Sequence, residues 1–192
     1  MRGTGKIAFQ AGVVLLALMA VNLLASCATK APKRNNDDSV LIYGFVKGGD
    51  GTSALKTIQL QGISDTGKRV VANAKFQPSN GIYYDLNLPP GRYTVTQLVY
   101  EWGGSGTMTY YVAKKDVFFK SKADIKNGFN VSAGSVYYAG TLRIINFTKD
   151  GQRYFRVEDD NDPPESEAID KLLKLITKGP WYDAIVAQKE LL

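Results

Sequence analysis

The one cysteine of the chain, Cys27, stands where its thiol could receive a covalent modification. It ends an apolar stretch whose densest part spans residues 13–20, and small residues come directly before it. Arg2 and Lys6 give the same stretch a positive start. A positive start, an apolar centre and small residues ahead of a cleavage point are the three parts of an export signal. The pattern therefore predicts that residues 1–26 are a signal peptide.

The four residues Leu24-Ala25-Ser26-Cys27 resemble the lipobox of bacterial lipoproteins. The resemblance implies that the Cys27 thiol is diacylglycerylated, that the signal is cut just before it, and that the new amino group is acylated, with palmitate among the expected chains. Two or more acyl chains hold a protein stably on a bilayer, whereas one chain holds it only marginally. We therefore expect a lipid-anchored protein of the cell envelope. Ala28 stands where Asp would favour inner-membrane retention in enteric-type bacteria, which favours the outer membrane.

An uncleaved signal anchor is the alternative interpretation, because residues 7–25 are nearly long enough to span a bilayer. Gln10 and Asn22 interrupt that run, and small residues cluster where a peptidase needs access. The order of the three parts therefore favours the cleaved signal.

The composition of the mature part limits the catalytic sites, metal sites and partners that we expect of it. Removing residues 1–26 from the 192-residue chain leaves 166 residues, enough for one domain with an apolar core. The mature part has 22 Lys and Arg against 18 Asp and Glu, a formal charge of +4. These charges are scattered, so we expect a solvated surface and no nucleic-acid partner. The chain has no histidine, which excludes Ser-His-Asp and Cys-His catalysis and histidine zinc sites. We expect no metal or cofactor.

From Ser39 the sequence consists of short runs of aromatic and β-branched residues, separated by turn residues about every 8–12 positions. This pattern predicts an antiparallel, immunoglobulin-like β-sandwich over residues 39–158. The preceding residues, 27–38, are polar without an apolar period, which predicts a flexible tether behind the lipidated cysteine. The longest strand signal contains five alternating residues that we expect on one face: Val136, Tyr138, Gly140, Leu142 and Ile144.

Three stretches of this β region together resemble the transthyretin-like, or carboxypeptidase-regulatory-like, domains found in bacterial lipoproteins. They are the strand signal at 40–46, the Leu-Pro-Pro-Gly-Arg-Tyr turn at 88–93, and the tyrosine-rich run at 131–140 that ends in glycine. The resemblance implies a transthyretin-like sandwich. It implies little about function, because one sandwich fold supports many unrelated roles.

A helical period begins only in the C-terminal extension, residues 159–192. Asp162, Pro163 and Glu165 have the types and spacing of an N-cap, a first helical residue and a capping-box glutamate. An apolar stripe then follows at helical spacing: Ile169, Leu172, Leu173 and Ile176. Two interpretations stay open. The stripe packs on the sheet of its own chain, or it binds a partner protein with Trp181 as an anchor.

Few other residues offer ligand chemistry. The acidic segment 158–162 lacks the spacing of an EF-hand loop, so a solvated turn is expected there rather than a calcium site. Glu101, Trp102 and Trp181 are the candidate ligand contacts. Two function classes remain. The one we favour is a noncatalytic binding or structural module that meets an envelope protein or polymer. The alternative is an accessory glycan-processing enzyme, which needs two carboxylates facing each other across a cleft.

Overall fold

The structure is a computed structural model that describes residues 31–48, 55–102, 106–111, 128–149 and 152–192. Residues Pro32–Leu192 form one compact unit, and the following description concerns that unit. The predicted signal peptide and Cys27 lie outside the described residues.

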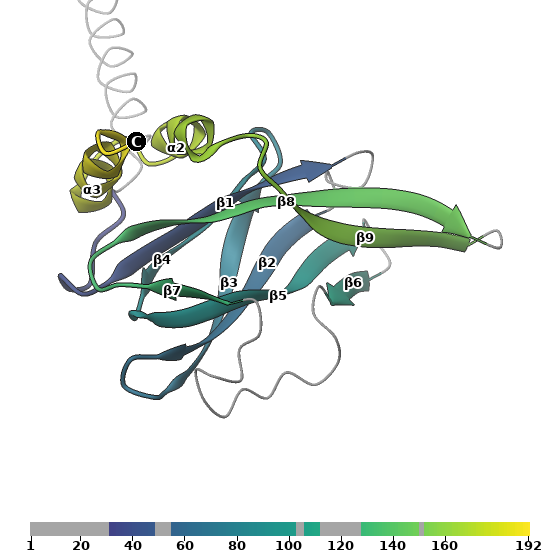
Figure 1. The fold of residues 1–192 in the computed structure, drawn as a ribbon, viewed down its shortest axis with the longest axis horizontal. Helices are drawn as coiled ribbons and strands as arrows, with labels where there is room; N and C mark the ends of the chain where they lie inside the picture. Colours follow the sequence, from purple (N-terminus) through teal and green to yellow (C-terminus); the bar gives the residue numbers. More distant parts are fainter. Residues whose placement is uncertain (1–30, 49–54, 103–105, 112–127, 150–151) are drawn as a thin grey trace, which may run out of the picture. The chain divides into compact units, whose positions relative to one another are not determined.

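The described unit is mainly β, with two short helices at its C-terminal end (Figure 1). The prediction of a mainly β fold followed by a helical extension is therefore confirmed. The strands are β1 (Val40–Gly48), β2 (Leu55–Ser64), β3 (Arg69–Gln77), β4 (Ile82–Leu88), β5 (Gly91–Trp102), β6 (Gly106–Tyr111), β7 (Phe129–Val131), β8 (Val136–Lys149) and β9 (Gln152–Asp160). The helices are α2 (Glu165–Leu173) and α3 (Pro180–Lys189).

These strands belong to one sheet, in the order β6-β5-β2-β3-β4-β1-β8-β9, with β7 paired to the start of β5. Most pairs are antiparallel, as predicted, and short turns join the paired strands β2 to β3 and β3 to β4. The pair β1–β8 is parallel, which differs from a wholly antiparallel arrangement. The sheet curls into a half-barrel, so that β2 and β5 come to face β8 (Figure 1).

The inside of the curl holds the first apolar core. It contains buried residues of β1, β2, β3, β4, β5, β7 and β8, among them Ile42, Leu60, Tyr93 and Leu142. One continuous sheet therefore encloses this core, where the prediction had two separate sheets in a sandwich. The register of β2 agrees with its alternating sequence, because Ile58 and Leu60 both point into this core.

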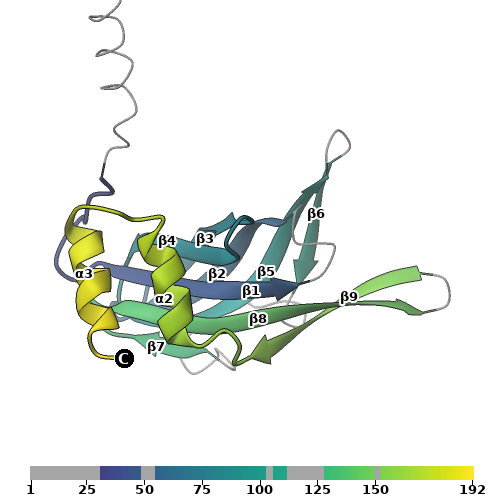
Figure 2. The ribbon, with the colours of Figure 1, turned by 90° about the horizontal axis from the view of Figure 1, so that it is seen from above.

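A second apolar core lies on the opposite face of β1, β4 and β8, where α2 and α3 cover the sheet (Figure 2). Leu41 and Tyr43 of β1 contribute to it, together with Ile169 and Leu172 of α2. β1 is therefore buried on both faces. This explains why its sequence is almost continuously apolar, a pattern expected of a strand that is covered on two sides.

The prediction that five alternating residues of β8 share one face is wrong, because the faces change between Tyr138 and Leu142. Leu142 and Ile144 point into the first core, as expected, but Val136 and Tyr138 belong to the second. Between Tyr43 and Phe45 of β1, the paired strand β8 advances by three residues instead of two. Gly140 lies in this bulge with a φ of 88°, a conformation that favours glycine. The extra residue exchanges the two faces of β8.

The start of α2 also differs from the prediction. The helix begins at Glu165 with Pro164 as its N-cap, and no side chain caps its first turn. Asp162, the predicted cap, instead forms an ion pair with Lys47 on β1. The Asp162 carboxylate, which the local sequence pattern assigned to the helix cap, therefore pairs with a lysine that is distant in the sequence.

Candidate functional site

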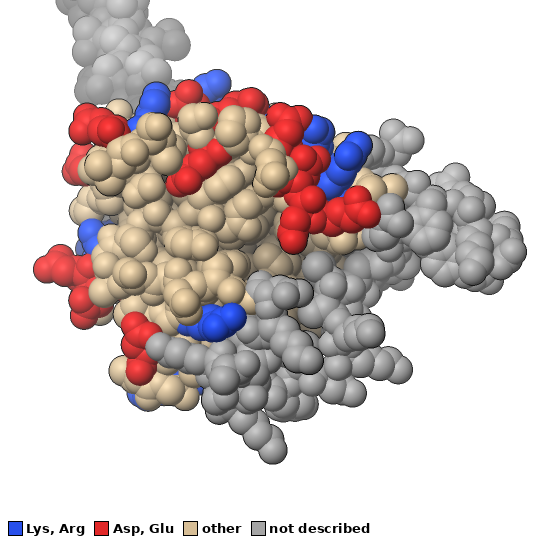
Figure 3. Space-filling model, viewed as in Figure 1, with Lys and Arg blue, Asp and Glu red and all other residues tan. Residues whose placement is uncertain are grey.

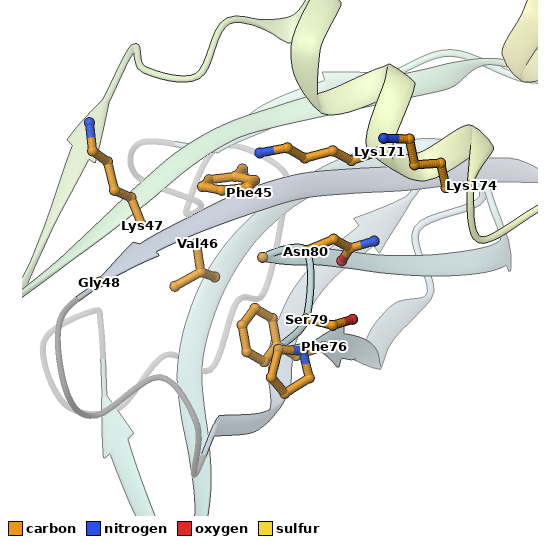
Figure 4. A pocket seen from close by; sticks show the side chains of 11 residues that line it. Phe45, Val46, Lys47, Gly48, Phe76, Ser79, Asn80, Lys171 and Lys174 are labelled. Carbon is orange, nitrogen blue, oxygen red and sulfur yellow. The ribbon is translucent and has the colours of Figure 1, made fainter.

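A groove of about 530 Å³ lies between three elements, at the C-terminal end of β1 (Figure 4). Residues 45–48 of β1 line it, together with Phe76 at the end of β3. The β3–β4 turn, residues 78–81, forms one side. Lys171 of α2 and Lys174, which directly follows that helix, form the other. This volume falls within the range of small-ligand sites, about 300–1,000 Å³.

The groove exists because β1 extends beyond the end of its pairing with β4. The pairing of β1 with β4 ends at Phe45, opposite Ile82, whereas its pairing with β8 continues to Gly48. The β3–β4 turn closes the space beside Val46, whose backbone N–H donates to the Gly81 carbonyl at 2.8 Å. Gly81 has a φ of 75°, and a Cβ there would meet the Phe45 ring at 2.6 Å. The tight turn therefore needs glycine at this position.

The charges of the groove come from lysines on two elements. The Lys171 ammonium lies 4.3 Å from the centre of the Phe45 ring and 2.8 Å from a Glu167 carboxylate oxygen. Lys47 pairs with Asp162 and, at 3.9 Å, with Asp160. Lys174 is exposed and makes no ion pair with any residue in the described ranges. The most accessible charge in the groove is thus a cation at the C-terminal end of α2.

The lining combines apolar side chains with cationic and hydrogen-bonding groups. Phe45 lies on the α2 side of β1, whereas Val46 and Phe76 belong to the first core on its other side. Ser79 and Asn80 add a hydroxyl and an amide. Among the described residues that line the groove, none is Asp or Glu. Such a lining can bind a ligand that carries negative charge beside an apolar part. It offers no pair of carboxylates for glycoside hydrolysis.

A buried polar network fixes α2 over the groove. The Tyr43 hydroxyl donates to Glu165 at 3.2 Å, and the Tyr138 and Thr141 hydroxyls both donate to the Pro163 carbonyl, at 3.0 and 3.1 Å. The rings of Tyr43 and Tyr138 lie 5.2 Å apart. Burial raises the pKa of Tyr43, and the Glu165 carboxylate raises it further, so this hydroxyl stays protonated as a donor. The start of α2 is therefore tied to both β1 and β8.

Of the three predicted contact residues, only Trp181 has a side chain within the described part of the chain. Glu101 and Trp102 end β5, with their backbones paired to Thr107 and Gly106 of β6, and their side chains lie outside the described residues. Trp181 is fully buried in the second core, so it cannot act as an exposed anchor for a partner in this structure. The stripe of α2 packs on its own sheet, which decides between the two interpretations left open above.

Two aspartates of the acidic segment before α2, Asp160 and Asp162, form ion pairs. Figure 3 shows acidic side chains gathered where β9 leads into α2, with basic ones beside them. Asp160 lies 4.0 Å from Arg143 as well as near Lys47. The hydrogen bond from Lys47 lowers the pKa of Asp162, and the charge of Lys47 lowers it further. Across the residues that the structure describes, no cluster of three potential metal-binding side chains occurs.

The groove residues were missed by the sequence analysis. Lys171 and Lys174 flank the apolar stripe of α2, which shows only that they lie at its edge. Their neighbours in the groove come from residues 45–48 and 76–81, about a hundred positions earlier in the chain. No local spacing links these segments.

Comparisons with known proteins give distant likenesses only. No protein-family model matches the chain, and no curated protein matches it. Among solved structures, a "putative cell adhesion protein" from Bacteroides fragilis NCTC 9343 is 13% identical with a TM-score of 0.34, over 64% of this chain and 45% of that one. A leucine-rich repeat protein from Bacteroides thetaiotaomicron VPI-5482 is also 13% identical with a TM-score of 0.31, over 56% of this chain and 14% of that one. The chain thus spans less than half the length of either protein.

Neither helix of the described unit has the length and apolar character needed to cross a bilayer.

Proposed function

We propose that this chain is a lipid-anchored lipoprotein of the cell envelope, and that its folded unit is a noncatalytic binding module. The observation that carries the anchor is Leu24-Ala25-Ser26-Cys27, placed at the end of a positive and then apolar segment. Ala28 supports the outer membrane as the location. The curled sheet, with β8 facing β2 and β5 across one core, is compatible with a variant of the transthyretin-like sandwich.

We propose further that the module binds through the groove beside α2. The partner is an envelope protein or polymer that presents negative charge next to an apolar surface. Support comes from Lys171 over the Phe45 ring, from the exposed Lys174 beside it, and from a described lining without carboxylates. A charged partner would also be steered toward such a site at low ionic strength.

The lipid anchor is tested by intact mass. The mature protein should begin at Cys27 and carry the mass of a diacylglyceryl group and an N-acyl chain, and it should incorporate labelled palmitate. Cys27→Ala should leave an unlipidated precursor that retains residues 1–26. An unmodified Cys27 thiol in membrane-purified protein would refute the anchor.

The groove is tested by retention on immobilised heparin, used here as a sulfated-polymer probe, with uncharged dextran as the reference. Lys171→Glu combined with Lys174→Glu should lower the salt concentration at which the protein elutes. Lys68→Glu combined with Lys178→Glu makes the same charge change at exposed positions outside the groove. Equal elution of the two double variants would show that only net charge matters, and the groove would lose its assignment.

A further inference from the structure

The residues just before β1 are attached to the folded unit by specific bonds. We call residues 33–38 the N-terminal strap. Within it, one guanidinium nitrogen of Arg34 donates to the carbonyls of Asp37, Ser39 and Gly134, at 2.6, 3.2 and 3.1 Å. Gly134 belongs to the turn before β8, so this side chain joins the strap to a segment 100 positions away. The predicted flexible tether therefore differs from the structure over its second half.

The side chain of Asn87 holds the same segment through two more hydrogen bonds. The Asn87 amide oxygen accepts the backbone N–H of Asn35 at 2.8 Å, and its amide nitrogen donates to the Lys33 carbonyl at 3.0 Å. Asn87 has a φ of 63°, within the bulge where β4 gains a residue over β1. Asparagine tolerates this conformation better than most residues. The bulge thus places the Asn87 side-chain amide where its oxygen accepts one hydrogen bond from the strap and its nitrogen donates another.

The strap also reaches the last helix of the chain. The Arg34 guanidinium lies 4.9 Å from the centre of the Trp181 ring, in the first turn of α3. Trp181 is fully buried, and a cation over an indole face is attractive at this distance. Figures 1 and 2 show the start of the described chain beside α3. One arginine therefore connects the beginning of the fold to its end.

We propose that the N-terminal strap holds the folded unit in a fixed orientation on the membrane, with its α3 end next to the lipid surface and the groove at the far end. This rests on the proposed lipid anchor at Cys27. Seven residue steps separate Cys27 from Arg34, a reach of at most about 25 Å. β1 starts at the strap and ends at the groove eight steps later, about 26 Å further along the strand.

The orientation is measured by energy transfer on liposomes. Acylation uses the only cysteine, so an introduced cysteine is the only free thiol for a fluorophore in the mature lipoprotein. Ser132→Cys places it in the turn beside Arg34, and Ser79→Cys places it in the turn beside the groove; both positions are exposed. Transfer to an acceptor on phosphatidylethanolamine head groups should be several-fold higher from position 132 than from position 79. Equal transfer from the two positions would overturn the proposal.

Variants of the strap then test the cause. Arg34→Ala and, separately, Asn87→Gly should reduce the difference in energy transfer between positions 132 and 79, because each removes some of the hydrogen bonds that hold the strap. Asn87→Gly keeps the Arg34 guanidinium over the Trp181 ring. It therefore tests the strap even if the loss of Arg34 disturbs α3. Lys33→Ala removes a neighbouring positive charge that makes no described side-chain contact, and it should leave the difference unchanged. A difference that survives both strap variants would refute the role of the strap.

A failure of the anchor is recognised separately. If the chain does not sediment with liposomes, the proposed lipidation is wrong. Hydrogen exchange on the mature chain made without acyl groups still reports on the strap itself. The backbone amides of Asn35, Asn36 and Ser39 each donate a hydrogen bond, so they should be protected at least tenfold over an unstructured chain. Arg34→Ala should remove the protection of Asn36 and Ser39. Unprotected amides in the unaltered chain would contradict the strap whether or not the protein is lipidated.

Discussion

Two buried tyrosine hydroxyls on opposite faces of the sheet illustrate how differently one functional group can be used. Tyr83 points into the first core, where its hydroxyl has no hydrogen-bond partner among the described residues, and it packs against Gly44, which has no side chain to block it. Tyr43 points into the second core and donates to Glu165. A buried polar group without a partner costs stability, whereas one bonded to a carboxylate contributes to it.

The paired substitutions Tyr83→Phe and Tyr43→Phe should therefore have opposite effects. We expect Tyr83→Phe to leave the free energy of unfolding unchanged or slightly higher, and Tyr43→Phe to lower it by about 1 kcal/mol. Urea denaturation measures both. The two rings lose the same atom, so each variant is the control for the other, and a larger loss in Tyr83→Phe would contradict the assignment.

Asp85 should make stability fall as the pH rises. Burial raises the pKa of this half-buried carboxyl above 3.8, although the Leu86 N–H and the charge of Lys75 oppose the shift. A raised carboxyl pKa means that the folded state binds the proton more tightly than the unfolded state. The free-energy cost of burying the charged carboxylate is absent below the unfolded-state pKa of 3.8 and complete above the folded-state pKa.

Asp85→Asn removes this penalty and keeps an oxygen that can accept the Leu86 N–H, now 2.8 Å from Asp85. The variant should gain stability over the parent at pH 7 and gain less at pH 4, as measured by urea midpoints at the two values. A gain of the same size at both would mean that burial does not destabilise the charged form.

At the scale of elements, α2 and α3 behave as a lid on the second face of the sheet. Leu41, Tyr43 and Ile82 are fully buried, and helix residues such as Ile169 and Leu172 cover that face. Each fully buried apolar side chain of this size contributes roughly 1.5–3 kcal/mol. The helices are therefore part of the folded unit and not a detachable appendage.

Truncation after Asp160 should expose that face and yield an unfolded or aggregated protein, seen as a lost unfolding transition and material in the void volume on gel filtration. Leu172→Ala is the milder form, with an expected loss of about 2–5 kcal/mol. The half-buried Leu173 offers a matched control, because Leu173→Ala should cost much less. A truncated chain that stays folded and monomeric would show that the sheet closes without the lid.

Strand positions followed well from the sequence, whereas their faces did not always follow. Turn residues and short runs of aromatic and β-branched residues indicated a mainly β fold correctly, because both signals are local. The bulge at Gly140 is set by pairing with β1, which is far away in sequence, so alternation alone could not reveal where Tyr138 would point. The same holds for Asp162, which a lysine on β1 takes from the helix it was expected to cap.

At the scale of the whole molecule, the candidate site was the least predictable part. The signal for a lipid anchor is contiguous and can be identified from four residues with the segment before them. The groove is assembled from β1, the β3–β4 turn and α2, and it depends on β1 outrunning β4 by three residues. That mismatch is a property of tertiary pairing. Composition could show only that lysines and aromatic residues were present in the chain.

The position of β1 has a mechanical consequence. The chain enters the folded unit through this strand, which is bonded to β4 along one edge and to β8 along the other. A pull on the N-terminal end acts along the strand axis, while the interstrand hydrogen bonds run across it. Such a force loads these bonds together in shear, whereas a pull on the open end of a hairpin unzips them one after another. A protein held by its N-terminus while its partner drags on the other end would thus be gripped at a central strand, where many bonds must break at once.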